Sequence, residues 1–222
     1  MNMHATAAAL RHSLRCRTTK LLLCAAGAAA LALTTMGPAT AGVGPIGTGT
    51  PLCNAGYTGT MTFTPPLTNT GTATSETVAL NMAFSGCSGG VPRPRSGSYT
   101  ATGTVTMPSA NACANWLVPP PGTSPLINLS PALSGTVTWS PATINTSTVS
   151  FSRMRFGTGG PGRIVAKLPG GVVTGSYAPT ASLLLRIMQH WAAVASACAN
   201  SSVPSLTIIQ STSATAISYG TW

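Results

Sequence analysis

The chain has 222 residues, of which 11 are Lys or Arg and only one is Asp or Glu, so its formal net charge is +10. General acid–base catalysis, glycoside hydrolysis and most metal sites depend on carboxylate and imidazole side chains, which are scarce here. The composition argues against most enzyme classes and against a metal ion or other cofactor. We therefore expect a non-catalytic protein.

Residues 1–41 have the pattern of a secretory signal peptide. Four basic residues and no acidic residue occur before position 21, and residues 21–33 are almost purely apolar. Small residues at Ala39 and Ala41 match the positions that a signal peptidase recognises, so we expect cleavage after Ala41. The apolar run of about 13 residues is shorter than the roughly 20 that a membrane-spanning helix needs. The pattern predicts general secretion of a soluble protein, and the alternative is a cytosolic protein with an apolar N-terminal helix.

Residues 42–222 would then form the secreted part, whose size fits a single domain with a hydrophobic core. This part contains seven basic residues and one acidic residue, which gives a formal charge of +6. Glu76 and His190 are its only carboxylate and imidazole side chains.

Three stretches alternate apolar and polar residues with the period of a half-buried β-strand, namely residues 57–63, 78–84 and 99–107. Shorter candidates, separated by Gly, Pro, Ser and Asn, are residues 135–139, 146–154, 163–168, 172–177 and 206–210. Many short strands at regular intervals predict a mainly β fold, an antiparallel β-sandwich or a barrel-like domain.

Four cysteines remain after the signal peptide, and an even number in an exported protein predicts two disulfides. If the first two strands form an antiparallel hairpin in which Thr60 lies opposite Asn81, opposite residues have numbers that sum to 141. The numbers of Cys53 and Cys87 sum to 140, so these cysteines should face each other at the open end of the hairpin.

The second disulfide would join Cys113 to Cys198, the two cysteines that remain. A zinc site is the competing interpretation. It is weak because no two of the four cysteines are close in sequence and the only nearby imidazole is His190.

Residues 181–199 are apolar without the two-residue period. Several side chains fall on one helical stripe, namely Leu184, Met188, Trp191, Ala195 and Cys198. The whole segment could be a helix. We prefer a split in which residues 182–186 finish a strand begun near Tyr177 and a short C-terminal helix follows from Gln189.

A set of short motifs runs through most of residues 50–210. They are TFTPPLT at 62–68, ETV at 76–78, FSGCSG at 84–89, GTVTW at 135–139, GSY at 175–177, ACA at 197–199 and SLTI at 205–208. With these motifs the chain resembles a group of small, uncharacterised secreted proteins of high-GC Gram-positive, actinobacterial-type bacteria. The resemblance implies an exported all-β domain and supplies no catalytic residues.

The basic residues of the secreted part are unevenly spread. Four of them surround the Gly-rich turn at 157–162, namely Arg153, Arg155, Arg163 and Lys167. If that turn joins two antiparallel strands, four positive groups gather at one end of the sheet. They would attract an anionic envelope polymer, lipid head groups or nucleic acid. The alternative is that a chain with few charges places them where its loops meet water.

A glycan of the cell envelope is a second candidate partner, because sugars stack on exposed aromatic rings. Trp139 and Trp191 lie in apolar patterns and are expected in the core. Trp116 follows Cys113 in a loop and is the best exposed candidate, and Trp222 is the fourth tryptophan.

The enzymatic alternative is a secreted hydrolase that combines a serine with His190 and Glu76. The chain has no Gly-x-Ser-x-Gly motif to present such a serine. Simpler roles are available to both residues, Glu76 as a solvent-facing strand residue and His190 as a residue on a helix surface.

Overall fold

The computed structural model describes residues 44–117, 124–159, 162–177, 179–209 and 217–219. The signal peptide expected in residues 1–41 lies outside these ranges. The described strands are β1 (Leu52–Leu67), β2 (Ser75–Ser88), β3 (Ser96–Thr106), β4 (Ile127–Ser140), β5 (Ser147–Gly159), β6 (Arg163–Gly175), β7 (Thr180–His190), β8 (Val203–Ile209) and β9 (Ile217–Tyr219). The described helices are α1 (Cys113–Trp116) and α2 (Trp191–Asn200).

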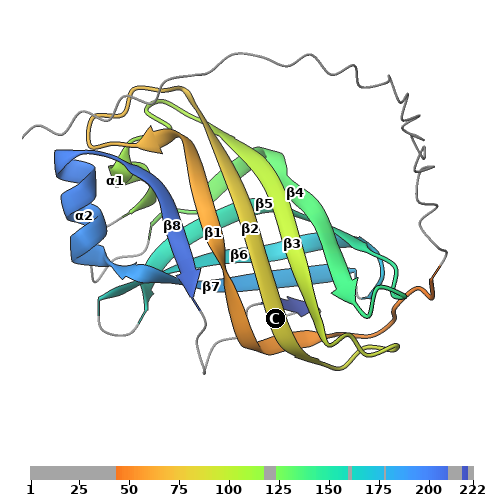
Figure 1. Cartoon of the computed structure of the whole chain (residues 1–222). Coiled ribbons are helices and arrows are strands. Elements are labelled where there is room, and N and C mark those ends of the chain that lie inside the picture. The colour runs from red at the N-terminus through yellow and green to blue at the C-terminus, as the bar shows by residue number, and fades with distance from the viewer. Residues whose placement is uncertain (1–43, 118–123, 160–161, 178, 210–216, 220–222) are drawn as a thin grey trace, which may run out of the picture. The chain divides into compact units, whose positions relative to one another are not determined.

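Strands β1 to β8 form a closed antiparallel barrel (Figure 1). Each strand pairs with the next strand along the chain, and β8 pairs back onto β1. The barrel alternative is therefore confirmed and the sandwich alternative is wrong. A sandwich leaves edge strands whose backbone N–H and C=O groups need protection, whereas closure satisfies those groups within the sheet.

The short strand β9 fills a gap in the wall. Both β8 and β9 run antiparallel to β1 and to β7, so they point the same way. Strand β8 pairs with β1 between Gly59 and Leu67, whereas β9 pairs with Leu52 and Cys53. The two strands thus share one position in the barrel wall, each at a different end.

Two details differ from the sequence-based expectation. Residues 163–168 and 172–177, expected as separate strands, belong largely to the single strand β6. The pairing of β6 with β7 shifts register between Leu168 and Gly171, and this bulge interrupts the alternating pattern. The preferred strand-then-helix split of residues 181–199 is confirmed, although α2 begins at Trp191 rather than at Gln189.

Within the ranges that the structure covers, no helix is long and apolar enough to cross a membrane.

Both expected disulfides are present. Thr60 pairs with Asn81 as the hairpin register requires, and Cys53 lies directly opposite Cys87 on β1 and β2. Cys113 at the start of α1 is bonded to Cys198 in α2. Two disulfides indicate that the protein folds in an oxidising environment such as the extracellular space.

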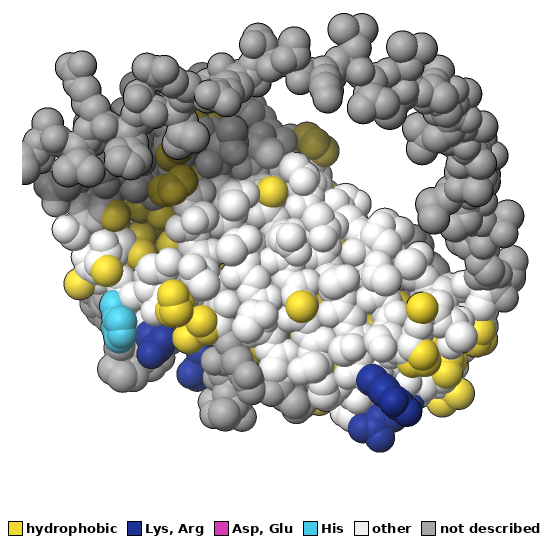
Figure 2. Space-filling view, viewed as in Figure 1, with side chains coloured by type: hydrophobic (Ala, Val, Ile, Leu, Met, Phe, Trp, Pro, Cys, Tyr) yellow, Lys and Arg dark blue, Asp and Glu magenta, His cyan; other side chains and the backbone are white. Residues whose placement is uncertain are grey.

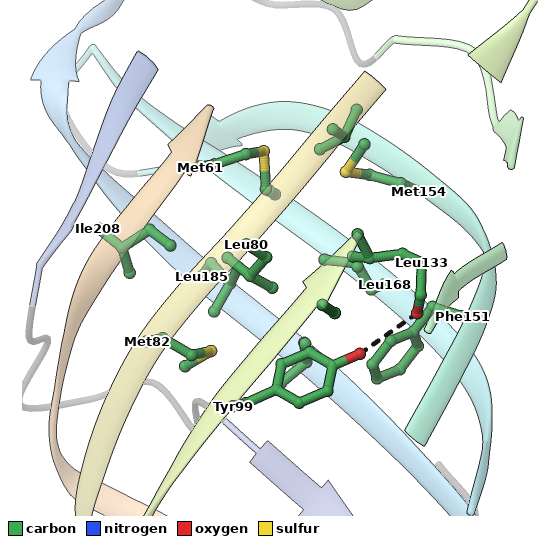
Figure 3. Close-up of a cluster of buried hydrophobic side chains, with 14 of the residues drawn as sticks. Met61, Leu80, Met82, Tyr99, Leu133, Phe151, Met154, Leu168, Leu185 and Ile208 are labelled. Carbon is green, nitrogen blue, oxygen red and sulfur yellow. Dashed lines mark hydrogen bonds between the residues drawn. The ribbon is translucent and has the colours of Figure 1, made fainter. Parts of the chain in front are cut away.

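The barrel interior is packed with side chains (Figure 3). An eight-stranded barrel is just wide enough for side chains to fill it. The buried set includes three methionines, Met61, Met82 and Met154, together with Leu80, Leu133, Leu168, Leu185 and Ile208. The hydroxyl of Tyr99 shares its one hydrogen between the carbonyl oxygens of Leu133 and Val149, each at 3.2 Å, so this polar group is satisfied inside the core.

One end of the barrel, which we call the helix end, carries α1, α2 and the β5–β6 turn (Figure 1). Trp116 of α1 is 0 % exposed and packs edge-on against Phe63 at 5.3 Å and Phe156 at 6.1 Å between ring centroids. The backbone N–H of Asn69 donates to the carbonyl oxygen of Cys198 at 3.1 Å. These contacts fasten both helices to the barrel rim.

The opposite end, which we call the strap end, is crossed by residues 44–51. The backbone N–H of Gly47 donates to the Ser176 hydroxyl at 3.0 Å, and the N–H of Tyr177 donates to the Gly47 carbonyl. A Cβ on Gly47 would lie 2.5 Å from the Tyr177 ring, so only glycine fits there. The Tyr177 hydroxyl donates to the Pro92 carbonyl at 3.0 Å, which ties the strap end together.

Candidate anion-binding wall

The four basic residues expected to gather around the β5–β6 turn lie on neighbouring strands. The turn joins β5 to β6 as an antiparallel pair, and Arg155 lies directly opposite Lys167. Both side chains are exposed, so they share the outer face of the barrel. Arg153 is exposed two residues before Arg155, and Arg163 opens β6 nearer the helix end.

Strand β7 adds two residues that the sequence analysis did not assign to this group. His190 pairs with Arg163, and Arg186 pairs with Val165, which lies between Arg163 and Lys167 on β6. The two-residue spacing of Arg186, Met188 and His190 is that of one face of a strand, which could have placed both basic residues on the outer face. The apolar content of the segment favoured a helix from residue 189 instead. We call the outward side chains Arg153, Arg155, Arg163, Lys167, Arg186 and His190 the basic wall.

No acidic side chain can neutralise the basic wall, because Glu76 is the only one in the chain and it is buried. The pairing of Arg155 with Lys167 therefore places like charges opposite each other on adjacent strands. Directly opposed like charges destabilise a sheet, since their Cβ atoms lie only about 5 Å apart. The Arg163 guanidinium donates to the Met188 carbonyl at 3.4 Å, which orders that side chain along β7.

Glu76 faces the barrel interior, so the expectation that it faces solvent is wrong. It is 0 % exposed and shares the inward face of β2 with Val78 and Leu80. Neither carboxylate oxygen has a hydrogen-bond partner in the described structure. Burial raises the pKa of the Glu76 carboxyl to about 7, and the nearby backbone N–H of Thr64 offsets part of this rise.

The residues of the hydrolase alternative do not form a charge relay. His190 is exposed at the junction of β7 and α2, on the outer face of the barrel. The Glu76 carboxylate lies inside the barrel and has no hydrogen-bond partner in the described structure. A triad needs a carboxylate that holds the imidazole in position. In this structure Glu76 does not orient His190.

The tryptophans offer no exposed stacking row among the described residues. Trp116, expected to be exposed, is fully buried because α1 turns it into the helix end, where its indole N–H donates to the Ala110 carbonyl at 2.6 Å. Trp139 is buried and Trp191 is partly buried against the core, as expected. Trp222 lies outside the described residues.

The basic wall also carries apolar surface. Met188, between Arg186 and His190 on β7, is 47 % exposed. Beside Lys167 lies a mainly apolar hollow of about 190 Å³, lined by Leu168, Pro169, Ser182, Leu183 and Leu184. Figure 2 shows hydrophobic side chains next to Lys or Arg side chains and a histidine at the helix end of the face in view.

A second, smaller basic group lies at the strap end. Arg93 and Arg95 line a hollow with Gly86 and Cys87. The Arg93 guanidinium donates to the Cys87 carbonyl at 3.2 Å, so it supports the β2–β3 connection. This pair is separate from the basic wall and provides an internal comparison for it.

Comparison with known proteins gave no match: no protein-family model fits the chain, and no curated protein or solved structure is significantly similar to it.

Proposed function

We propose that the protein is a secreted, non-catalytic binding protein whose basic wall binds an anionic component of the cell envelope. The observation that carries this proposal is the direct opposition of Arg155 and Lys167 on the outer face of a chain whose only acidic side chain is buried. The repulsion between these two side chains lowers the stability of the fold when no anion is bound. A bound anion would neutralise the charges and remove that repulsion.

Two further features support a binding role. The side chains of the basic wall come from three adjacent strands of a closed barrel, so the backbone holds them at fixed spacing. A rigid scaffold lowers the entropy lost on binding. Export, which residues 1–41 predict, would bring this surface to the envelope, and the disulfides fit that environment.

The test is salt-dependent retention on immobilised phosphate, such as phosphocellulose. We expect the wild type to elute at clearly higher salt than the double variant Arg155→Ser, Lys167→Ser, because two central charges are lost. The matched control is Arg93→Ser, Arg95→Ser, which removes the same number of charges from the strap end and should elute close to the wild type.

Equal loss of retention in the two double variants would contradict the proposal, since it would show that net charge alone governs binding. Wild-type protein that fails to bind at low salt would contradict it as well.

A further inference from the structure

The outer face of β6 and β7 alternates basic and apolar side chains, both along β7 and across the pairing of β6 with β7. Along β7 the outward residues are Leu184, Arg186, Met188 and His190. Across the ladder, Lys167 pairs with Leu184 and Arg186 pairs with Val165. Each of these two cations therefore has an apolar side chain directly opposite it.

Strand β3 shows that the barrel does not require this pattern. The outward positions of β3 carry only serine and threonine, as at Ser98, Thr100 and Thr102. Those positions face solvent in the same barrel and need no apolar side chain. The apolar residues between the cations thus call for a separate explanation.

Two of the five exposed large apolar residues among the described positions lie beside the cations. Met188, 47 % exposed, is on β7, and Leu126, 43 % exposed, directly precedes β4 on the other side. Strand β4 pairs with β5 so that Asn128 lies opposite Arg153, which places Leu126 beside the arginines of β5.

We infer that the anionic component bound by the basic wall is an anionic lipid surface. This inference rests on the proposed function and names its ligand. The cations would contact the phosphates of the head groups, while Met188 and Leu126 would enter the boundary between head groups and acyl chains. Long basic side chains suit this position because their stems pack on apolar surface while their charged ends reach the phosphates.

The apolar surface beside the cations favours this occupant over a soluble polyanion such as a polyglycerol phosphate. A soluble polyanion has no apolar part and would gain nothing from an exposed Met188 or from the apolar hollow beside Lys167. A lipid surface supplies both kinds of contact at once.

The test is co-sedimentation of the full secreted chain with vesicles. We expect binding to vesicles of phosphatidylglycerol mixed with phosphatidylcholine, and no binding to phosphatidylcholine alone. Met188→Ser should weaken the binding about fivefold, because roughly half of a methionine side chain would no longer be buried. The matched control is Val91→Ser, which removes a side chain that is 71 % exposed at the strap end and should leave binding unchanged.

A variant that should bind the vesicles more tightly complements the variants that should bind them more weakly. Met188→Trp should strengthen binding to the mixed vesicles, because tryptophan favours the membrane interface. Its fluorescence should shift to shorter wavelength with these vesicles but not with a soluble polyglycerol phosphate.

The outcomes separate this inference from the proposed function. If Met188→Ser and Val91→Ser bind the vesicles equally while Arg155→Ser, Lys167→Ser still loses retention on phosphate, the lipid inference fails and the proposed function stands. If the double arginine–lysine variant loses nothing on either probe, both fail. Tighter binding of duplex DNA than of the vesicles, unaffected by Met188→Ser, would also overturn the lipid inference.

Discussion

The two ends of the barrel are closed by different means. At the helix end, long connections carry two helices, and a disulfide joins residues 85 positions apart. At the strap end, the chain crosses the opening and is held by backbone hydrogen bonds and Tyr177, and the disulfide there joins neighbouring strands 34 positions apart. The helix end also has the buried Glu76 and most of the basic wall. Among the described basic residues, the strap end carries only the Arg93 and Arg95 pair, whereas the helix end carries most of the basic wall.

The largest effects on stability should appear when the disulfides are removed one at a time. Replacing Cys113 and Cys198 by serine should lower the free energy of unfolding by about 4.5 kcal/mol, because the loss of entropy in the unfolded chain grows with the length of the closed loop. Replacing Cys53 and Cys87 should cost about 4 kcal/mol. Urea unfolding followed by circular dichroism measures both values. A strap-end variant clearly less stable than the helix-end variant would contradict this order.

Glu76 should make the helix end sensitive to pH. Its pKa is raised from an unfolded value near 4.5 to about 7 in the folded protein, so the folded state binds the proton more tightly. Its favourable contribution is complete below pH 4.5 and is lost as pH rises through 7. We expect the wild type to lose about 2 kcal/mol of stability between pH 5 and pH 8.

Glu76→Gln should flatten that profile and be more stable than the wild type at pH 8. Thermal unfolding at several pH values would measure the effect. Parallel pH profiles for the variant and the wild type would show that Glu76 is not the group responsible.

A smaller effect is expected at the strap end. Tyr177→Phe removes the hydroxyl that donates to the Pro92 carbonyl and should cost about 1 kcal/mol. The ring and its edge-on contact with Trp139, at 4.8 Å between centroids, are kept in this variant. Chemical denaturation at neutral pH is the measurement, and a variant as stable as the wild type would show that the hydroxyl is not needed to close this end.

The smallest effects should differ in sign between the ends. Arg155→Ser removes the repulsion with Lys167 and should raise stability by about 0.3 kcal/mol at low salt. Arg93→Ser removes a hydrogen bond to the Cys87 carbonyl and should lower stability by about 0.5 kcal/mol. Added salt should reduce the first effect, so the pair is best compared at two ionic strengths by calorimetry.

The features that depend on local periodicity and residue spacing could be predicted from the sequence. The alternation in residues 57–63 and 78–84 fixed the hairpin register, and that register led to the Cys53–Cys87 pair. Barrel closure could not be predicted this way, because it depends on β1 meeting β8 far along the chain. Sandwich and barrel strands share the same two-residue pattern.

The site was predicted in part for a similar reason. The four basic residues around the β5–β6 turn are close in sequence, so a local argument could bring them together. Arg186 and His190 join them only through the pairing of β6 with β7. The burial of Trp116 was missed because a four-residue helix gives little periodic signal. Glu76 continues the inward positions of Val78 and Leu80, but a carboxylate is expected in water, so its burial was missed as well.

The barrel is closed by the last strands of the chain, and this order affects how the protein folds. Strand β1 can meet β2 early, but its other side is completed only by β8 and β9, about 150 residues later. Contacts of such long range slow folding, and the barrel cannot close until the C-terminal part of the chain is free. A chain that crosses a membrane as an extended thread meets this condition, so slow assembly would favour translocation over premature folding in the cytoplasm.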